Sequence, residues 1–130
     1  MGNRAIITKH PYDENNVGVY VHWNGGIPSV TGFLRAAKRL GYRDVQSDEQ
    51  YGIARLIQAI GLFFGGECSL GVDVCRHLDD SDNGVYTINE NWEIETHRGE
   101  KPRELTTDED DIANAVADTI VTRTQAAEGI

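Results

Sequence analysis

The most informative local pattern in the chain is Val17-Gly18-Val19-Tyr20-Val21-His22-Trp23-Asn24-Gly25-Gly26-Ile27-Pro28-Ser29. Valine recurs at every second residue in its first part, which predicts a strand with the three valines on the core side and with Tyr20 and His22 on the other. Two glycines end this pattern, and the proline and serine that follow are typical of the first turn of a helix. The stretch therefore predicts a strand that turns directly into a helix.

The same periodicities predict the other elements on both sides of this stretch. Strands are expected at 5–8, 70–74, 85–88 and 92–96, and helices at 28–40, 47–64 and 106–123, where Ser47 and Thr106 each begin a capping-box pattern. The order ββααβββα predicts an α+β fold in which an antiparallel sheet of about five strands is covered mainly on one face by three helices. We expect one domain over residues 1–123 and a frayed tail over 124–130.

Composition and charge limit the classes of partner. The chain has 130 residues, of which 39% are hydrophobic and 25% charged, as expected of a globular protein. We expect a cytoplasmic protein with reduced cysteines at 68 and 75, because no apolar run spans a bilayer and no signal peptide is evident. Residues 1–66 carry a net charge of +2 and residues 67–130 carry −11, which together give the −9 of the chain. The acidic half opposes broad nucleic-acid binding; it suits either solubility or a partner protein with a basic groove.

The segment His22-Trp23-Asn24-Gly25-Gly26 is the main candidate for a binding site. A glycine-rich strand-to-helix junction offers backbone N–H groups and the positive end of a helix dipole to an anion. Trp23 adds a face on which a base can stack, while His22, Asn24 and Ser29 add polar groups. The alternative is a tight turn with Trp23 in the core and Ser29 as a cap.

Three arginines extend this candidate site. Arg35 and Arg39 lie four residues apart, so they share a helix face, as a phosphate pocket needs, and Arg55 lies on the next helix. A solvated helix surface explains the same residues. Together with the glycine-rich segment, these arginines favour a nucleotide-type ligand.

A weaker candidate is a calcium loop in residues 79–90. Asp79, Ser81, Asn83 and Glu90 match the spacing of oxygen ligands in such a loop. An acidic hairpin turn explains the same residues, because the flanking segments have the period of strands. No other cofactor is expected, since Cys75 and His77 lack the spacing of a zinc site.

Several motifs together resemble a family of small proteins of bacteriophages and bacterial mobile elements. The similarity covers most of residues 1–95 and rests on these segments: Met1-Gly2-Asn3-Arg4-Ala5, His22–Gly26, Tyr51–Arg55, Phe63-Phe64-Gly65-Gly66, Asp82–Tyr86 and Asn91–Ile94. The resemblance implies no catalytic residue. It implies a context, because small accessory proteins of such elements often block a nuclease complex or sequester an immune signalling nucleotide.

The leading hypothesis is a non-enzymatic counter-defence protein that binds and sequesters a nucleotide-type immune signal in the host cytoplasm. A second hypothesis is an inhibitor of a host defence protein, such as an anti-CRISPR or nucleic-acid mimic, that uses the acidic C-terminal half. A third is a small nucleotide-processing enzyme with His22 as acid or base. A homo-oligomer is compatible with all three, because a pocket can form between copies.

Overall fold

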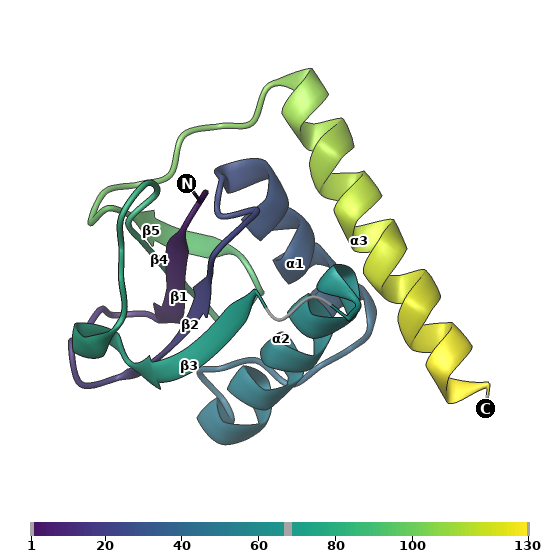
Figure 1. The fold of residues 1–130 in the computed structure, drawn as a ribbon, viewed down its shortest axis with the longest axis horizontal. Helices are drawn as coiled ribbons and strands as arrows, with labels where there is room; N and C mark the ends of the chain where they lie inside the picture. The colour runs from purple at the N-terminus through teal and green to yellow at the C-terminus, as the bar shows by residue number, and fades with distance from the viewer. Residues whose placement is uncertain (1, 67–68, 130) are drawn as a thin grey trace.

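Five strands form one sheet in the computed structural model, which describes residues 2–66 and 69–129 (Figure 1). The strands β1 (Ala5–Lys9), β2 (Val17–Val21), β3 (Leu70–Val74), β4 (Val85–Ile88) and β5 (Ile94–His97) lie in the order β3-β2-β1-β4-β5. The helices are α1 (Ile27–Arg39), α2 (Glu49–Phe64) and α3 (Thr107–Glu128), with one short 3-10 helix, η1 (Cys75–His77). Apart from η1, the predicted α+β class and element order are confirmed.

The prediction of a wholly antiparallel sheet is wrong for one strand pair. β1 and β4 are parallel, with Ile6 opposite Val85, while the other neighbouring pairs are antiparallel. The segment between β3 and β4 carries the chain back across the sheet, and Asn83 N donates to the carbonyl oxygen of Arg4 at 3.0 Å, so that β4 starts beside the start of β1. The sequence predicts a turn within residues 79–90, but a turn pattern does not say which strand the next strand will join.

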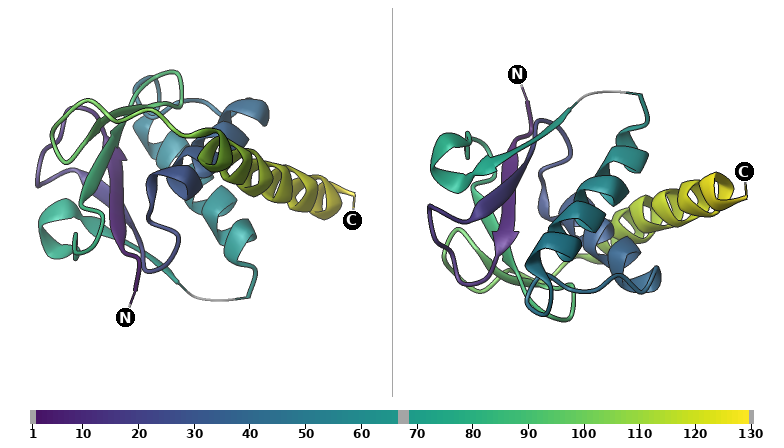
Figure 2. Two further views of the ribbon diagram at one scale, coloured as in Figure 1. Left: turned by 90° about the horizontal axis from the view of Figure 1, so that it is seen from above. Right: turned by 90° about the horizontal axis from the view of Figure 1, so that it is seen from below.

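The helices form two further layers on one face of the sheet. Figure 2 shows α1 and α2 against the sheet and α3 outside them, with its C-terminal part projecting beyond the rest of the molecule. Val19 and Val21 are fully buried in the core between sheet and helices, as predicted. Val17 is 37% exposed and does not join them, because it lies at the start of β2 beside a hollow at the beginning of α2.

A close contact between helix backbones holds α3 against α1. A Cβ atom at Gly32 would lie 2.6 Å from the Cβ of Val116 and 2.7 Å from the carbonyl oxygen of Ala113. No side chain fits into that space, so glycine is required there for the helices to approach. This contact places the acidic first turns of α3 next to the basic side chains of α1.

The helix starts agree with the sequence in one case and differ in another. Thr106 and Glu109 form the predicted capping box of α3. For α2 the predicted cap at Ser47 is wrong: the side chain of Asp48 accepts the N–H of Tyr51 at 3.2 Å, and Ser47 hydrogen-bonds to Asp44. An Asp next to a Ser competes for the same capping position, and the tight turn at Asp44 decides between them.

The last helix is longer than the sequence indicated. α3 continues through residues 124–128, and Thr124 is only 4% exposed. Arg123 donates to the carbonyl oxygens of Leu62 and Phe63 at 2.8 and 2.7 Å, which ties this part of α3 to the end of α2. Among the residues that the structure describes, no helix is long and apolar enough to cross a bilayer. Cys75 is a buried free thiol, and Cys68 lies outside the described residues.

Candidate functional site

The glycine-rich turn at His22–Gly26 is fastened to the N-terminal segment. Asn3 N donates to the carbonyl oxygen of His22, and Gly25 N donates to that of Asn3, both at 2.8 Å. A Cβ atom at Gly25 would lie 2.4 Å from the oxygen of Asn3, so only glycine permits this approach. The N–H group of Gly25, which the sequence suggested for an anion, is therefore used within the fold.

Other polar groups of the turn are also occupied. The hydroxyl of Tyr86 donates to the carbonyl oxygen of Gly25 at 2.7 Å inside the core, where burial raises the pKa of the tyrosine. Asn24 donates through Nδ2 to Oγ of Ser29 at 3.1 Å, and Pro28 offers no N–H in the first turn of α1. The predicted binding loop thus has most features of a built turn.

Trp23 and His22 lie on the surface of this turn. Trp23 is 45% exposed, which excludes the alternative that its indole fills the core. Its ring meets the imidazole of His22 edge-on at 5.1 Å, and Nδ1 of His22 lies 2.7 Å from the hydroxyl of Tyr20. A stacking face is therefore present, but neither residue lines the cleft described below.

The three predicted arginines do not converge on the turn. Arg35 donates to Asp110 at 2.7 Å and to Asn114 at 2.9 Å, and Arg39 pairs with Asp118 of the same helix. The acidic helix α3 thereby neutralises the basic face of α1. Arg55 lies apart from them, with its guanidinium 4.8 Å from the ring centre of Tyr51 and 5.6 Å from that of Tyr42, in the lining of a different hollow.

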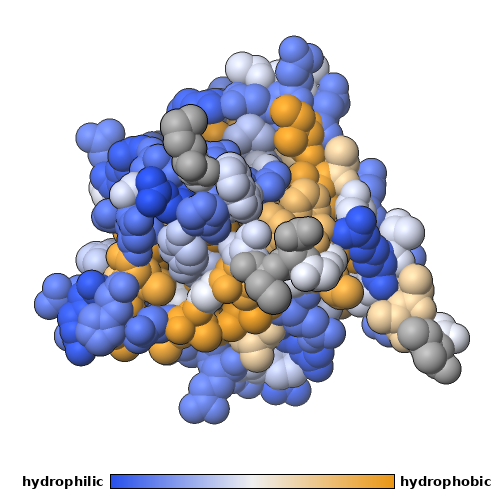
Figure 3. All heavy atoms as spheres, viewed as in Figure 1, coloured by the Kyte–Doolittle hydropathy of each residue, from blue (hydrophilic) through white to orange (hydrophobic). Residues whose placement is uncertain are grey.

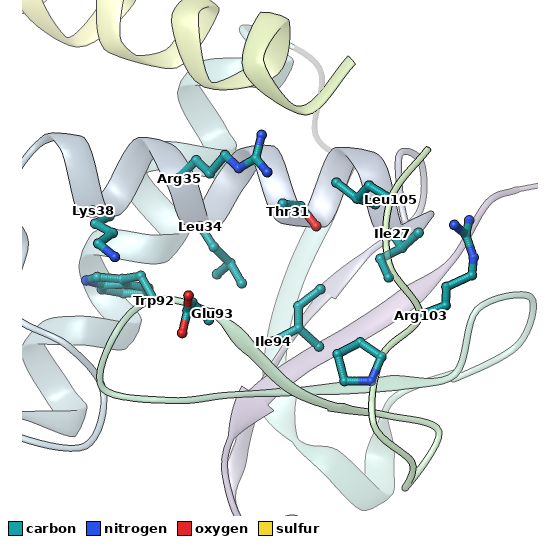
Figure 4. Close-up of a pocket in the computed structure, with 11 residues that line it drawn as sticks. Ile27, Thr31, Leu34, Arg35, Lys38, Trp92, Glu93, Ile94, Arg103 and Leu105 are labelled. Atoms are coloured by element: carbon teal, nitrogen blue, oxygen red, sulfur yellow. The ribbon is translucent and has the colours of Figure 1, made fainter. Parts of the chain in front are cut away.

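A cleft of 420 Å³ lies between α1, the start of β5 and the segment before α3 (Figure 4). Its floor is apolar, since Leu34 and Trp92 are 1% and 5% exposed. Three cations and one carboxylate stand around it. The cleft is lined by Ile27, Thr31, Leu34, Arg35, Lys38, Trp92, Glu93, Ile94, Pro102, Arg103 and Leu105. Of the predicted site residues, only Arg35 is among them.

The cations of the cleft differ in how far they are already paired. Arg103 holds Glu109 through two hydrogen bonds of 2.6 Å and lowers the pKa of that carboxyl to about 2, helped by the N–H of Thr106. Arg35 points out of the cleft toward α3, whereas Lys38 extends toward the indole of Trp92 (Figure 4). Within residues 2–66 and 69–129, Lys38 has no carboxylate within ion-pair distance. Lys38 is therefore the cation available to a ligand.

Most of this cleft could not be predicted from the sequence. Lys38, Trp92 and Arg103 come from three segments that are far apart in the chain, and each has an ordinary local explanation. The predicted strand at 92–96 is wrong at its first residue: Trp92 lies in a turn with φ 56° and donates through Nε1 to the carbonyl oxygen of Tyr42 at 2.9 Å. No local pattern shows that these side chains meet.

The four residues of the predicted calcium loop do not come together. Glu90 follows β4, whereas Asp79, Ser81 and Asn83 precede this strand. Because β4 has four residues in extended conformation, its two ends are about 10 Å apart, and Glu90 lies beyond the far end. Asp79 accepts from Ser81 N at 2.8 Å and pairs with Arg4 at 2.9 Å. Among the residues described, no group of three His, Cys, Asp or Glu side chains is placed to hold a metal.

Comparison with protein-family models, with curated proteins and with solved structures found no match to this chain.

Proposed function

We propose that the protein binds a small anionic ligand of the nucleotide type in the cleft beside α1 and holds it without converting it. The proposal rests on the position of Lys38 at the edge of an apolar floor, where no carboxylate of residues 2–66 and 69–129 pairs with it. A volume of 420 Å³ is within the range of ligand pockets. The floor suits a base or another flat apolar group, and Lys38 suits a phosphate.

The negative net charge of the protein restricts anion binding to places where cations are locally available. The net charge of −9 repels anions at a distance, so an anion is retained only where local cations outnumber carboxylates. In the cleft, Arg35 and Arg103 are already paired with Asp110 and Glu109, so among the described residues Lys38 is the cation that remains to oppose the carboxylate of Glu93 and to hold an anion. The hydroxyl of Thr31 adds a donor for orientation.

The setting that we propose is counter-defence by a bacteriophage or mobile element. It is supported by the resemblance of the His22–Gly26, Phe63–Gly66 and Asp82–Tyr86 motifs to small proteins of such elements. A protein that only has to hold an immune signal in the host cytoplasm needs a cleft and a cation, but no catalytic group. The His22–Gly26 turn then serves to position α1, whose first residue lines the cleft.

Calorimetric titration with cyclic nucleotides and cyclic ADP-ribose isomers tests the proposal. We expect at least one of them to bind, and we expect Lys38→Glu to weaken that binding about tenfold or more, because it replaces the free cation by an anion. The matched control is Arg76→Glu at an exposed residue of η1, which makes a similar change of charge outside the cleft. Absence of heat with every ligand, or equal affinity for both variants, would exclude this site.

A second candidate function, inhibition of a host defence protein, is favoured by one face of α3. Asp108, Asp111 and Ile112 are all exposed and lie at helical spacing on this face, and Ile112 is 48% exposed. Two carboxylates around an apolar side chain suit a basic groove that otherwise holds nucleic acid.

Competition with DNA for a CRISPR effector complex, measured at increasing salt, distinguishes this candidate. Inhibition that disappears with Asp108→Lys and Asp111→Lys together, but persists with Glu90→Lys, supports it. An inhibition that does not depend on salt contradicts it.

A further inference from the structure

The outer side of β3 is the edge of the sheet, and its hydrogen-bond pattern shows which residues face outward (Figure 1). His22 N donates to the carbonyl oxygen of Ser69, and Cys75 N donates to that of Asn16, both at 2.9 Å. In an antiparallel pair, hydrogen bonding to the neighbour alternates from one residue to the next. The odd-numbered residues from 69 to 75 therefore bond to β2, and the even-numbered residues direct their N–H and C=O groups away from the sheet.

Two of the outward-facing residues keep their backbone groups free. The N–H of Val74 is occupied, because it donates to Oδ1 of its neighbour Asp73 at 2.7 Å. For Leu70 and Val72, no hydrogen-bond partner of the N–H or C=O group is found among the described residues. The N–H and C=O groups of Leu70 and Val72 thus form a row of two donors and two acceptors along the edge. The row does not continue to the N–H of Val74, because Asp73 accepts that group.

The side chains beside this row are apolar. Val72 is 56% exposed and Val17 is 37% exposed, and both lie on the helix-covered side of the sheet, in neighbouring strands. Figure 3 shows hydrophobic surface along this part of the molecule, over β3 and the adjoining helix. Asp73 is the only charged residue of β3, so the edge lacks the lysines and prolines that usually prevent edge pairing.

We propose that β3 pairs with β3 of a second copy of the chain, antiparallel, about a two-fold axis that passes between the two Gly71 residues. In this register Leu70 lies opposite Val72 of the partner subunit, and Val72 lies opposite the partner's Leu70. All four free groups of each copy are then satisfied. The register also places an apolar pair on each side of the axis and makes one ten-stranded sheet from the two five-stranded ones.

Three features favour a second copy over an unrelated strand. The free N–H and C=O groups of Leu70 and Val72 lie symmetrically on the two sides of Gly71, so two copies of this segment can satisfy each other. The proposed pairing needs no N–H group from Val74, which already donates to Asp73. Gly71 has no side chain at the axis, where the backbones of a non-hydrogen-bonded pair approach to about 4.5 Å. Asp73 faces Ser69 of the partner subunit, so no like charges lie opposite each other.

The long-range charge of the molecule opposes this association. Two copies with a net charge of −9 repel each other, and salt screens that repulsion. The contact is also a single strand pair, which is small for a permanent dimer. We therefore expect a concentration-dependent dimer that becomes tighter as salt is added.

Sedimentation equilibrium from about 10 μM to about 1 mM tests the proposal. We expect the mass to rise from 14.4 kDa toward twice that value. Val72→Lys should raise the dissociation constant at least about tenfold, because it places a charge beside the partner's apolar side chain. Ile112→Lys makes the same change at an isoleucine on α3 that is 48% exposed, and it should have no effect. A monomer at every concentration, or equal effects of the two variants, would overturn the proposal.

Amide hydrogen exchange tests the register without a variant. As the concentration rises, exchange should slow at the amides of Leu70 and Val72, whereas that of Val74 should not change because Asp73 already holds it. Slowing confined to other segments of the protein would show that any dimer forms elsewhere and would contradict the proposed pairing.

Discussion

The His22–Gly26 turn and the cleft beside α1 differ in how their polar groups are used. In the turn, Gly25 N, Gly25 O and Asn24 Nδ2 all bond within the protein. In the cleft, Lys38 faces an apolar floor, and no carboxylate in the described part of the chain lies within ion-pair distance of it. The glycines and aromatic residues of the His22–Gly26 turn thus form the connection between β2 and α1. The concave surface is instead formed by common residue types from segments that are distant in the sequence.

A short segment rich in glycine and aromatic residues is therefore a poor predictor of a ligand-binding site. Glycines, an Asn with φ 60° and a nearby Pro are what a sharp strand-to-helix junction requires. A ligand requires convergence and unsatisfied groups, and neither is a property of a short segment. Variants that separate stability from binding therefore distinguish the two regions.

The largest effect is expected from Gly25→Ala. The added Cβ would lie 2.4 Å from the carbonyl oxygen of Asn3 and 2.9 Å from the Cβ of Ala5, so the first strand has to shift. We expect a loss of about 2–4 kcal/mol in the free energy of unfolding, measured with urea. Gly26→Ala is the control, because its nearest neighbour is 3.7 Å away, and it should change little. Equal losses would show that the turn is not held by this approach.

A smaller loss is expected from Tyr86→Phe. This change keeps the buried ring but leaves the carbonyl oxygen of Gly25 without its donor at 2.7 Å. The expected cost is about 1–2 kcal/mol in the free energy of unfolding. Affinity for a ligand in the cleft should be nearly unchanged, since Tyr86 does not line it. If Tyr86→Phe lowered ligand affinity without lowering stability, the His22–Gly26 turn would have to be part of the binding site.

Low pH should weaken the ion pair between Arg103, which lines the cleft, and Glu109. Arg103 and the N–H of Thr106 lower the pKa of Glu109 to about 2 from its usual 4.5, so the folded state favours the ionised carboxylate. The stability from this pair is present above the unfolded-state pKa and is lost as the pH falls from about 5 toward about 2. Urea unfolding across this range should show a shallower decline for Glu109→Gln than for the natural chain. Parallel curves would contradict the role of this pair.

The smallest effect on stability is expected from Trp23→Ala. The indole is 45% exposed, so its removal should change the free energy of unfolding by less than about 1 kcal/mol. If the cleft is the binding site, ligand affinity should also be retained. A clear loss of affinity in calorimetry would mean that the exposed indole, rather than the floor at Trp92, contacts the ligand.

The fold was largely predictable because its elements have strong local periods. Val19 and Val21, the apolar stripe of α1 and the capping box at Thr106 follow from spacing alone. The parallel pairing of β1 with β4 did not follow, because strand order depends on how the segment after η1 crosses the sheet. Local patterns determine the type of an element, whereas its neighbours depend on contacts that are distant in the sequence.

The α+β class, the order of elements, the sharp turn at Gly25 and the acidic character of the second half all follow from local patterns in the amino-acid sequence. Packing of the folded chain brings Arg35 and Arg39 to carboxylates of α3. Among the described residues, it also leaves Lys38 without an ion pair near Trp92, and the edge groups of Leu70 and Val72 without partners. The reason is physical. Whether a charge or a backbone group is free depends on every group that packs around it, and those groups come from all parts of the chain.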